Sequence, residues 1–206
     1  ACAPGAKQCC AALLHACEEA QSDVGNCIVF LVGGAGNGKS HLAKTVTDAI
    51  DGKLIPEPES GPFAKRSYKY DLAKGGNLHV LNDATIPPSL PNSGSDFLVQ
   101  DIQDVLRNNS NFLACVNRGV LISEYKEIDD DIADPFYSTS AELLKWLLGN
   151  GKPNDANLTK LDNMTSDSEY YAYCEVTLSD GKPTRIHEAF MDRASLFEPQ
   201  PDVSDN

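Results

Sequence analysis

One stretch of the chain has residue types and spacing that suit phosphate chemistry. Residues 33–40 follow the pattern G-x-x-x-x-G-K-S. Glycines let the backbone curl so that successive N–H groups point at one anion, and a following helix adds its positive N-terminal end. Lys39 can reach the terminal phosphates, and Ser40 can place its hydroxyl on Mg²⁺. The residues expected to bind nucleotide are Gly33, Gly34, Ala35, Gly36, Asn37, Gly38, Lys39, Ser40 and His41.

The elements around this loop distinguish it from a chance match. Residues 27–32 form an apolar run typical of a buried strand, and residues 39–50 have the apolar spacing of a helix. The alternative is an ordinary glycine turn between a strand and a helix. Such a turn gives no role to the Lys-Ser pair, so we expect a strand, a phosphate-binding loop and a helix in that order.

Magnesium at such a loop requires an acidic group, usually at the end of a neighbouring buried strand. Residues 78–81 have that form, and Asn82 and Asp83 follow them directly. Ligands of parallel sheets bind at the carboxyl ends of the strands, where Asn117 is also expected to lie. Ser40 and Asp83 are the expected metal ligands. The alternative is that Asn82-Asp83 is an incidental turn at a strand end.

Together these motifs resemble the core of an AAA+ ATPase over about residues 10–195. In that family the strand typically ends in Asp-Glu, where Asp orders the Mg²⁺ shell and Glu activates the attacking water. Here the pair is Asn82-Asp83, which allows two alignments. Either Asp83 is the metal-side acid and the water is activated from elsewhere, or Asn82 takes the metal position and Asp83 acts as base. Both predict slow hydrolysis, because a displaced base loses its alignment with the water.

The resemblance gives Asn117 the role of a sensor that contacts the γ-phosphate or the attacking water. It also implies an arginine supplied by a neighbouring subunit, with Arg118 and Arg193 as candidates, and therefore a homo- or hetero-oligomer. The catalytic residues it implies are Lys39, Asp83, Asn82 and Asn117.

The resemblance to known families has two further implications. The helical lid that the family carries is not expected, because nothing after residue 195 could form it. Residues 115–124, and the hairpin that leads into residues 190–192, bear a faint resemblance to ATPase subunits of bacterial phosphorothioate-linked DNA restriction systems. That resemblance suggests a role directed at DNA, in restriction or defence.

Strand and helix patterns alternate along the chain, which predicts an α/β fold. We expect the three-layer α/β/α P-loop NTPase fold with a mainly parallel sheet and a C-terminal hairpin. Strands are also expected at 67–72 and 112–116, and the hairpin at 170–178 with 184–191. Helices are expected at 6–21, 96–107, 120–128 and from a capping box at 139–142, and exposed connections at 53–66 and 152–168.

The expected organisation has three parts. Residues 1–22 are a helix that leads into the core, residues 23–196 are the ATPase core, and residues 197–206 are a loose tail. The net charge of −13 argues against a free-standing nucleic-acid binder, so nucleic acid is expected only through partners or a local patch. No apolar run approaches the length of a membrane span and no signal peptide is present, which predicts a cytoplasmic protein without membrane contact.

The sequence favours Mg²⁺-dependent binding and hydrolysis of ATP that drives conformational change in a larger assembly. One alternative is a nucleotide-binding switch or scaffold subunit with little turnover, suggested by Asn82-Asp83. Another is a small P-loop kinase, although such kinases usually bring several arginines to the transferred phosphate and this chain has only five. ATP and Mg²⁺ are the expected ligands.

Overall fold

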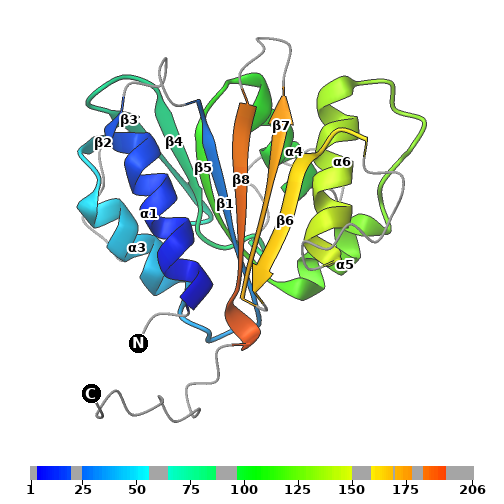
Figure 1. The fold of residues 1–206 in the computed structure, drawn as a ribbon, viewed down its shortest axis with the longest axis horizontal. Helices are drawn as coiled ribbons and strands as arrows, with labels where there is room; N and C mark the ends of the chain where they lie inside the picture. The colour runs from blue at the N-terminus through cyan, green and yellow to red at the C-terminus, as the bar shows by residue number, and fades with distance from the viewer. Residues whose placement is uncertain are drawn as a thin grey trace.

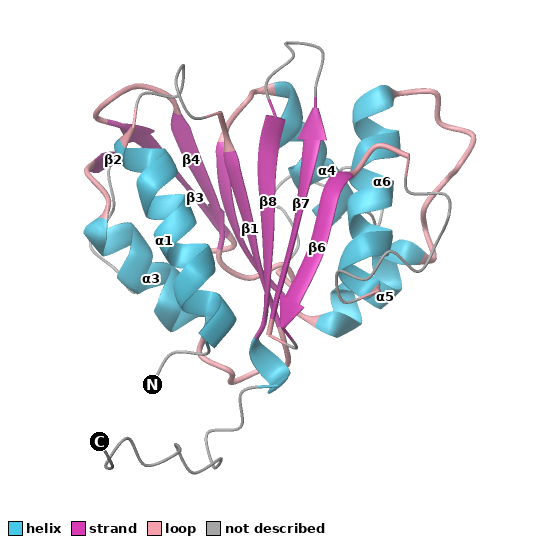
Figure 2. Ribbon diagram, viewed as in Figure 1, coloured by secondary structure: helices cyan, strands magenta, loops and turns pink. Residues whose placement is uncertain are grey.

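The computed structural model describes residues 4–19, 25–55, 65–86, 97–149, 159–168, 170–177 and 183–193. An eight-stranded sheet forms the centre, with helices packed on both faces (Figures 1 and 2). One face is covered by α1 and α3, and the other by α4, α5 and α6. The α/β class and the helical layers on both faces are therefore as the sequence predicts.

The strands run in the order β2-β3-β4-β5-β1-β8-β7-β6. Their bounds are β1 Cys27–Val32, β2 Gly52–Ile55, β3 Ser67–Leu72, β4 Asn77–Leu81, β5 Asn111–Val116, β6 Asp162–Ser168, β7 Tyr171–Thr177 and β8 Pro183–Phe190. The helices are α1 Pro4–Glu18, α3 Lys39–Ala49, α4 Phe97–Arg107, α5 Arg118–Tyr125 and α6 Pro135–Leu148, and a short 3₁₀-helix, η1, spans Met191–Arg193.

The expectation of a mainly parallel sheet is wrong, because the sheet is mixed. Strands β4, β5, β1 and β8 are parallel neighbours at its centre. The flanking pairs β2–β3, β3–β4, β7–β8 and β6–β7 are antiparallel. The short connections at the flanks explain this, since a parallel crossover requires a dozen or more residues. Gly75 and Gly76, with φ of 92° and 83°, turn β3 directly into β4.

The central strands are buried on both faces, which their composition predicts. Every residue of β1 and of β5 is buried, as expected for parallel strands between two helical layers. Phe30 and Phe112 meet edge to face on one side of the sheet, with ring centroids 6.0 Å apart. Residues on the two faces of these strands belong to two separate apolar clusters. These strands therefore form a rigid base for the loops at their ends.

Helix α6 begins earlier in the chain than the sequence predicts. The capping box at 139–142 is wrong, because α6 begins at Pro135 and the Asp134 carboxylate accepts from the N–H groups of Phe136 and Tyr137. Proline suits a first helical position because its nitrogen has no hydrogen to leave unbonded. Thr139 lies inside the helix, where its hydroxyl donates to the Pro135 carbonyl.

The start of α4 is capped from another helix. The buried carboxylate of Glu124, in α5, accepts from the N–H groups of Leu98 and Val99 at 2.7–3.0 Å. A carboxylate at this position satisfies unbonded donors and meets the positive end of the helix dipole. This contact fixes α5, and with it the segment that follows β5, against α4.

Candidate functional site

The loop after β1 is shaped by glycines in left-handed backbone. Gly36 has a φ of 81° and Gly38 a φ of 77°, and a Cβ at either residue would meet no atom within 4 Å. Conformation rather than space therefore requires glycine here. Gly38 is also the N-cap of α3 and contributes no side-chain cap. The first turn of α3 thus keeps its N–H groups for another acceptor.

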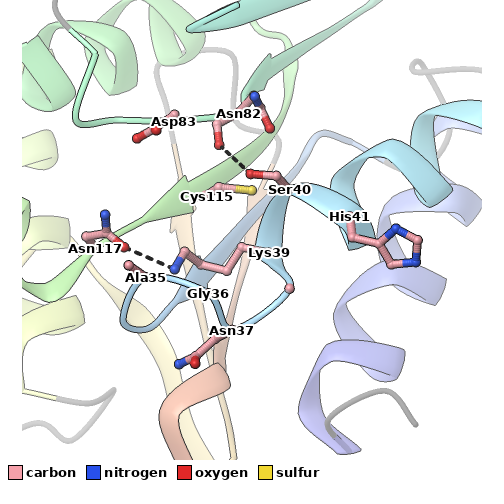
Figure 3. Close-up of a pocket in the computed structure, with 11 residues that line it drawn as sticks. Ala35, Gly36, Asn37, Lys39, Ser40, His41, Asn82, Asp83, Cys115 and Asn117 are labelled. Carbon is pink, nitrogen blue, oxygen red and sulfur yellow. Dashed lines mark hydrogen bonds between the residues drawn. The ribbon is translucent and has the colours of Figure 1, made fainter. Parts of the chain in front are cut away.

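Lys39 begins α3 and folds back over the loop. Its Nζ donates to the carbonyl oxygens of Gly33 at 2.7 Å and Gly34 at 2.5 Å. It also donates to Asn117 Oδ1 at 3.0 Å, the bond drawn in Figure 3. Burial lowers the pKa of Lys39, while the nearby carboxylates of Asp192 and Asp83 act in the opposite direction. The carbonyl groups of the loop therefore hold the ammonium in place. The ammonium lies at the cavity, where its positive charge would attract an anion.

The carboxyl ends of β1, β4 and β5 surround one cavity of about 350 Å³. Figure 3 shows its wall, in which the loop and the start of α3 face the residues that follow β4 and β5. The lining residues are Ala35, Gly36, Asn37, Gly38, Lys39, Ser40, His41, Asn82, Asp83, Cys115 and Asn117. Gly33 and Gly34 do not line it and serve instead as acceptors for Lys39.

The pair that follows β4 is held by the backbone that leads into β3. The N–H groups of Asn82 and Asp83 both donate to the Arg66 carbonyl. Asn82 is buried, and its Nδ2 donates to the Lys65 carbonyl at 3.2 Å. The Asp83 side chain points the other way in Figure 3 and accepts from the N–H and hydroxyl of Thr85. Ser40 Oγ donates to the Asn82 carbonyl oxygen at 3.4 Å (Figure 3).

The Asn117 side chain faces the cavity and does not cap its own helix. Asn117 is the N-cap of α5, with extended backbone at φ −87° and ψ 142°. Asparagine at an N-cap normally accepts from the first turn. Here Oδ1 accepts from Lys39 instead. Departures from local preference of this kind are expected at functional or strained positions.

Sequence reasoning missed Asp192, which follows β8 in η1. Its Oδ1 accepts from the Gly34 N–H and from Asn37 Nδ2, and its Oδ2 accepts from Arg118 Nε at 2.8 Å. Burial would raise the pKa of Asp192, but the Gly34 N–H and the Arg118 guanidinium outweigh it and lower the pKa. The signal available in the sequence was its position: it comes directly after a buried strand, as Asp83 and Asn117 do.

Cys115 lines the cavity and is a second residue for which the sequence predicts no role. It is buried, and burial raises the pKa of its thiol to about 12. The thiol is therefore neutral beside Lys39 at ordinary pH. All six cysteines that the structure describes are buried free thiols, where cysteine packs as a small apolar residue. Of the two candidate arginines, Arg118 pairs with Asp192, and the side chain of Arg193 lies outside the described residues.

The residues present suit a magnesium–phosphate complex better than a protein-only metal site. Within the described residues, no group of three or more His, Cys, Asp or Glu side chains could hold a metal ion. Magnesium usually takes one or two protein oxygens and completes its shell with phosphate oxygens and water. Ser40 and Asp83 both line the cavity and could provide those protein oxygens.

Comparisons with known protein families, with curated proteins and with solved structures found no match. The functional argument therefore depends on the geometry of the cavity and on the chemistry of its residues. In the part of the chain that the structure describes, no helix has the length and apolar character that crossing a membrane requires.

Proposed function

We propose that this protein binds a nucleoside triphosphate with Mg²⁺ and hydrolyses it, with ATP the expected nucleotide. The observation that carries the proposal is that three features line one cavity. They are the Lys39 ammonium, the N-terminus of α3, which has no side-chain cap, and the Asp83 carboxylate. A helix N-terminus and an ammonium favour phosphate, while a carboxylate and a hydroxyl favour its magnesium ion. This combination is of little use for a neutral ligand.

Each residue then has a defined task. The loop N–H groups and the first turn of α3 bind phosphate oxygens, and Lys39 exchanges its loop carbonyls for the terminal phosphates. Ser40 and Asp83 hold Mg²⁺, which supplies charge neutralisation at the phosphates. Asn117 contacts Lys39 and would orient either the γ-phosphate or the attacking water. Of the two alignments of Asn82-Asp83, we favour Asp83 as the metal-side acid, because a carboxylate is the usual protein ligand of Mg²⁺ and the Asn82 side chain is buried with its Nδ2 turned to the Lys65 carbonyl.

A second candidate is a nucleotide-dependent switch with little turnover. Asp83 provides the one carboxylate among the described residues that line the cavity. If Asp83 holds the metal, a water molecule at the γ-phosphate has no second carboxylate among these lining residues to accept its proton as a base. Turnover would then depend on a group supplied by another subunit of an assembly, and DNA is one candidate target of that assembly.

The test is to measure ATP binding and phosphate release with Mg²⁺, alone and with single- or double-stranded DNA. Lys39→Ala should weaken ATP binding by about tenfold or more, because it removes a charge-assisted contact. Asp83→Ala should retain nucleotide binding without Mg²⁺ and lose the gain that Mg²⁺ provides. Lys44→Ala is the matched control, since Lys44 is exposed on the same helix and pairs with Asp48.

The possible outcomes separate the candidates. Turnover that requires both Lys39 and Asp83 supports the hydrolase. ATP binding that requires Lys39, without phosphate release under any condition, supports the switch. ATP binding that is equal in wild type and Lys39→Ala would overturn the assignment of the phosphate site.

A further inference from the structure

We propose that Asp192 is a positioning residue that ties the outer side of the phosphate loop to the start of α5. The inference rests on the proposed nucleotide function and deepens it. The Asp192 bridge consists of the Asp192 carboxylate with Gly34, Asn37 and Arg118, which come from three separate segments of the chain. No other role for this carboxylate follows from the proposed steps at the phosphates.

The bridge lies behind the loop, and Asn37 is its one residue that also lines the cavity. Asp192, Arg118 and Gly34 are absent from the cavity lining, and Asn37 points away from Lys39 toward η1 in Figure 3. The contact is close, since a Cβ on Gly33 would meet Met191 Cβ at 2.9 Å and Asp192 Oδ1 at 3.1 Å. The first residue of the loop therefore rests directly on η1, and the loop cannot move outward without breaking the bridge.

The loop and α5 are joined on both sides. Inside the cavity, Lys39 donates to Asn117, and outside it the next residue, Arg118, pairs with Asp192. When Lys39 turns to a phosphate group, the inner link weakens. The Asp192 bridge is then what keeps Asn117 close to the loop, so its effect should be larger with nucleotide bound than without.

The effect of the Asp192 bridge on the site depends on the positive charge of Arg118. The Asp192 and Arg118 side chains are 29% and 37% exposed, so their pairing contributes little to the stability of the fold. An unpaired carboxylate beside the phosphate loop would, however, repel a triphosphate. Arg118 therefore serves the site by neutralising Asp192, and removal of Arg118 alone should be more harmful than removal of both charges.

The test compares the affinity for N-methylanthraniloyl-ATP with Mg²⁺ among full-chain variants. Asp192→Ala should weaken binding about tenfold, as loss of a charge-assisted hydrogen-bond network predicts, while the melting temperature without nucleotide stays close to wild type. Arg118→Ala should weaken binding at least as much, and Asp192→Asn combined with Arg118→Ala should restore part of that loss. Asp130→Ala is the control, because Asp130 is an exposed acid that pairs with Lys145 away from the loop.

The outcomes separate this inference from the proposed function. Normal binding by Asp192→Ala, with loss of binding by Lys39→Ala, overturns the inference and leaves the nucleotide site standing. Absence of binding by the wild type removes both. If the double variant binds no better than Arg118→Ala, Arg118 acts on the nucleotide directly and the positioning role of Asp192 is wrong. If Asp192→Ala fails to fold, Asp192→Asn provides the same comparison with the side-chain shape retained.

Discussion

Lys39 Nζ and Asn117 Oδ1 lie 3.0 Å apart, although 78 residues separate them in the chain. Lys39 starts the helix after β1, and Asn117 follows β5, the strand that pairs with β1 in parallel. The bond joins the phosphate loop to the position where a γ-phosphate or its attacking water would lie. It is also the contact that nucleotide would change first, because Lys39 would exchange a neutral amide for an anion.

Asn117→Ala should therefore affect turnover more than affinity. Loss of the amide removes a group that acts on the γ-phosphate or water, and we expect phosphate release to fall by about tenfold or more. Affinity for ADP, which lacks that phosphate, should change little. Single-turnover phosphate release and ADP titration measure the two effects. Asn108→Ala, at the exposed end of α4, is the control, and an equal loss of ADP and ATP affinity would contradict this role for Asn117.

Gly38→Ala should reduce stability although no atom obstructs a methyl group there. The φ of 77° is strained for alanine, so we expect the free energy of unfolding to fall by about 1–2 kcal/mol. Gly119 is the matched control, because a Cβ there also meets nothing within 4 Å and its backbone is helical. Gly119→Ala should be neutral or slightly stabilising. Urea denaturation of both variants measures the difference, and similar effects would show that strain at Gly38 is absent.

Glu124→Ala should destabilise the protein, although Glu124 does not line the cavity. The carboxylate is buried and accepts from Leu98 and Val99 at the start of α4. Its removal leaves buried donors without their acceptor, and we expect a loss of about 1–3 kcal/mol. Chemical denaturation measures this loss against Glu127→Ala, an exposed acid two residues past the end of α5. Equal stability of the two variants would contradict the role of Glu124 as the cap of α4.

His79 should make the stability depend on pH. Burial, followed by the charges of Lys69 and Arg66, lowers the pKa of His79 to about 4. A histidine in an unfolded chain titrates near pH 6.5, so the unfolded state binds more protons between these values. The stabilising contribution is full above about pH 6.5 and is lost as pH falls toward 4.

His79→Phe should therefore lose less stability than wild type when the pH falls from 7 to 5. The expected difference is about 1–2 kcal/mol, measured by urea denaturation at each pH. His15→Gln is the control, since His15 is exposed on α1. Parallel pH profiles for wild type and His79→Phe would contradict a neutral, half-buried His79.

The strands at 27–32 and 67–72 have the bounds that their residue patterns predict. The first is an apolar run and the second alternates, so each carries its own signal. β2 and β6 lie largely in the segments that the sequence predicts to be exposed connections, because these strands have no such pattern. β2 is largely exposed, and the sequence of β6, DNMTSDS, is polar. Both are edge strands of the sheet, where pairing with one neighbour is enough and little apolar surface is buried.

Local chemistry determined the glycine-rich loop of residues 33–38. The glycines of residues 33–38, the Lys-Ser pair and the flanking strand and helix depend on neighbours in the chain, and the sequence alone predicts them. Tertiary structure decided which residues distant in the chain lie next to the loop. The order β4-β5-β1-β8 brings four parallel strand ends to one edge, and only this order places Asp192 outside the loop and Asp83 within the cavity. Contacts between residues distant in the chain follow from strand order, which no local pattern contains.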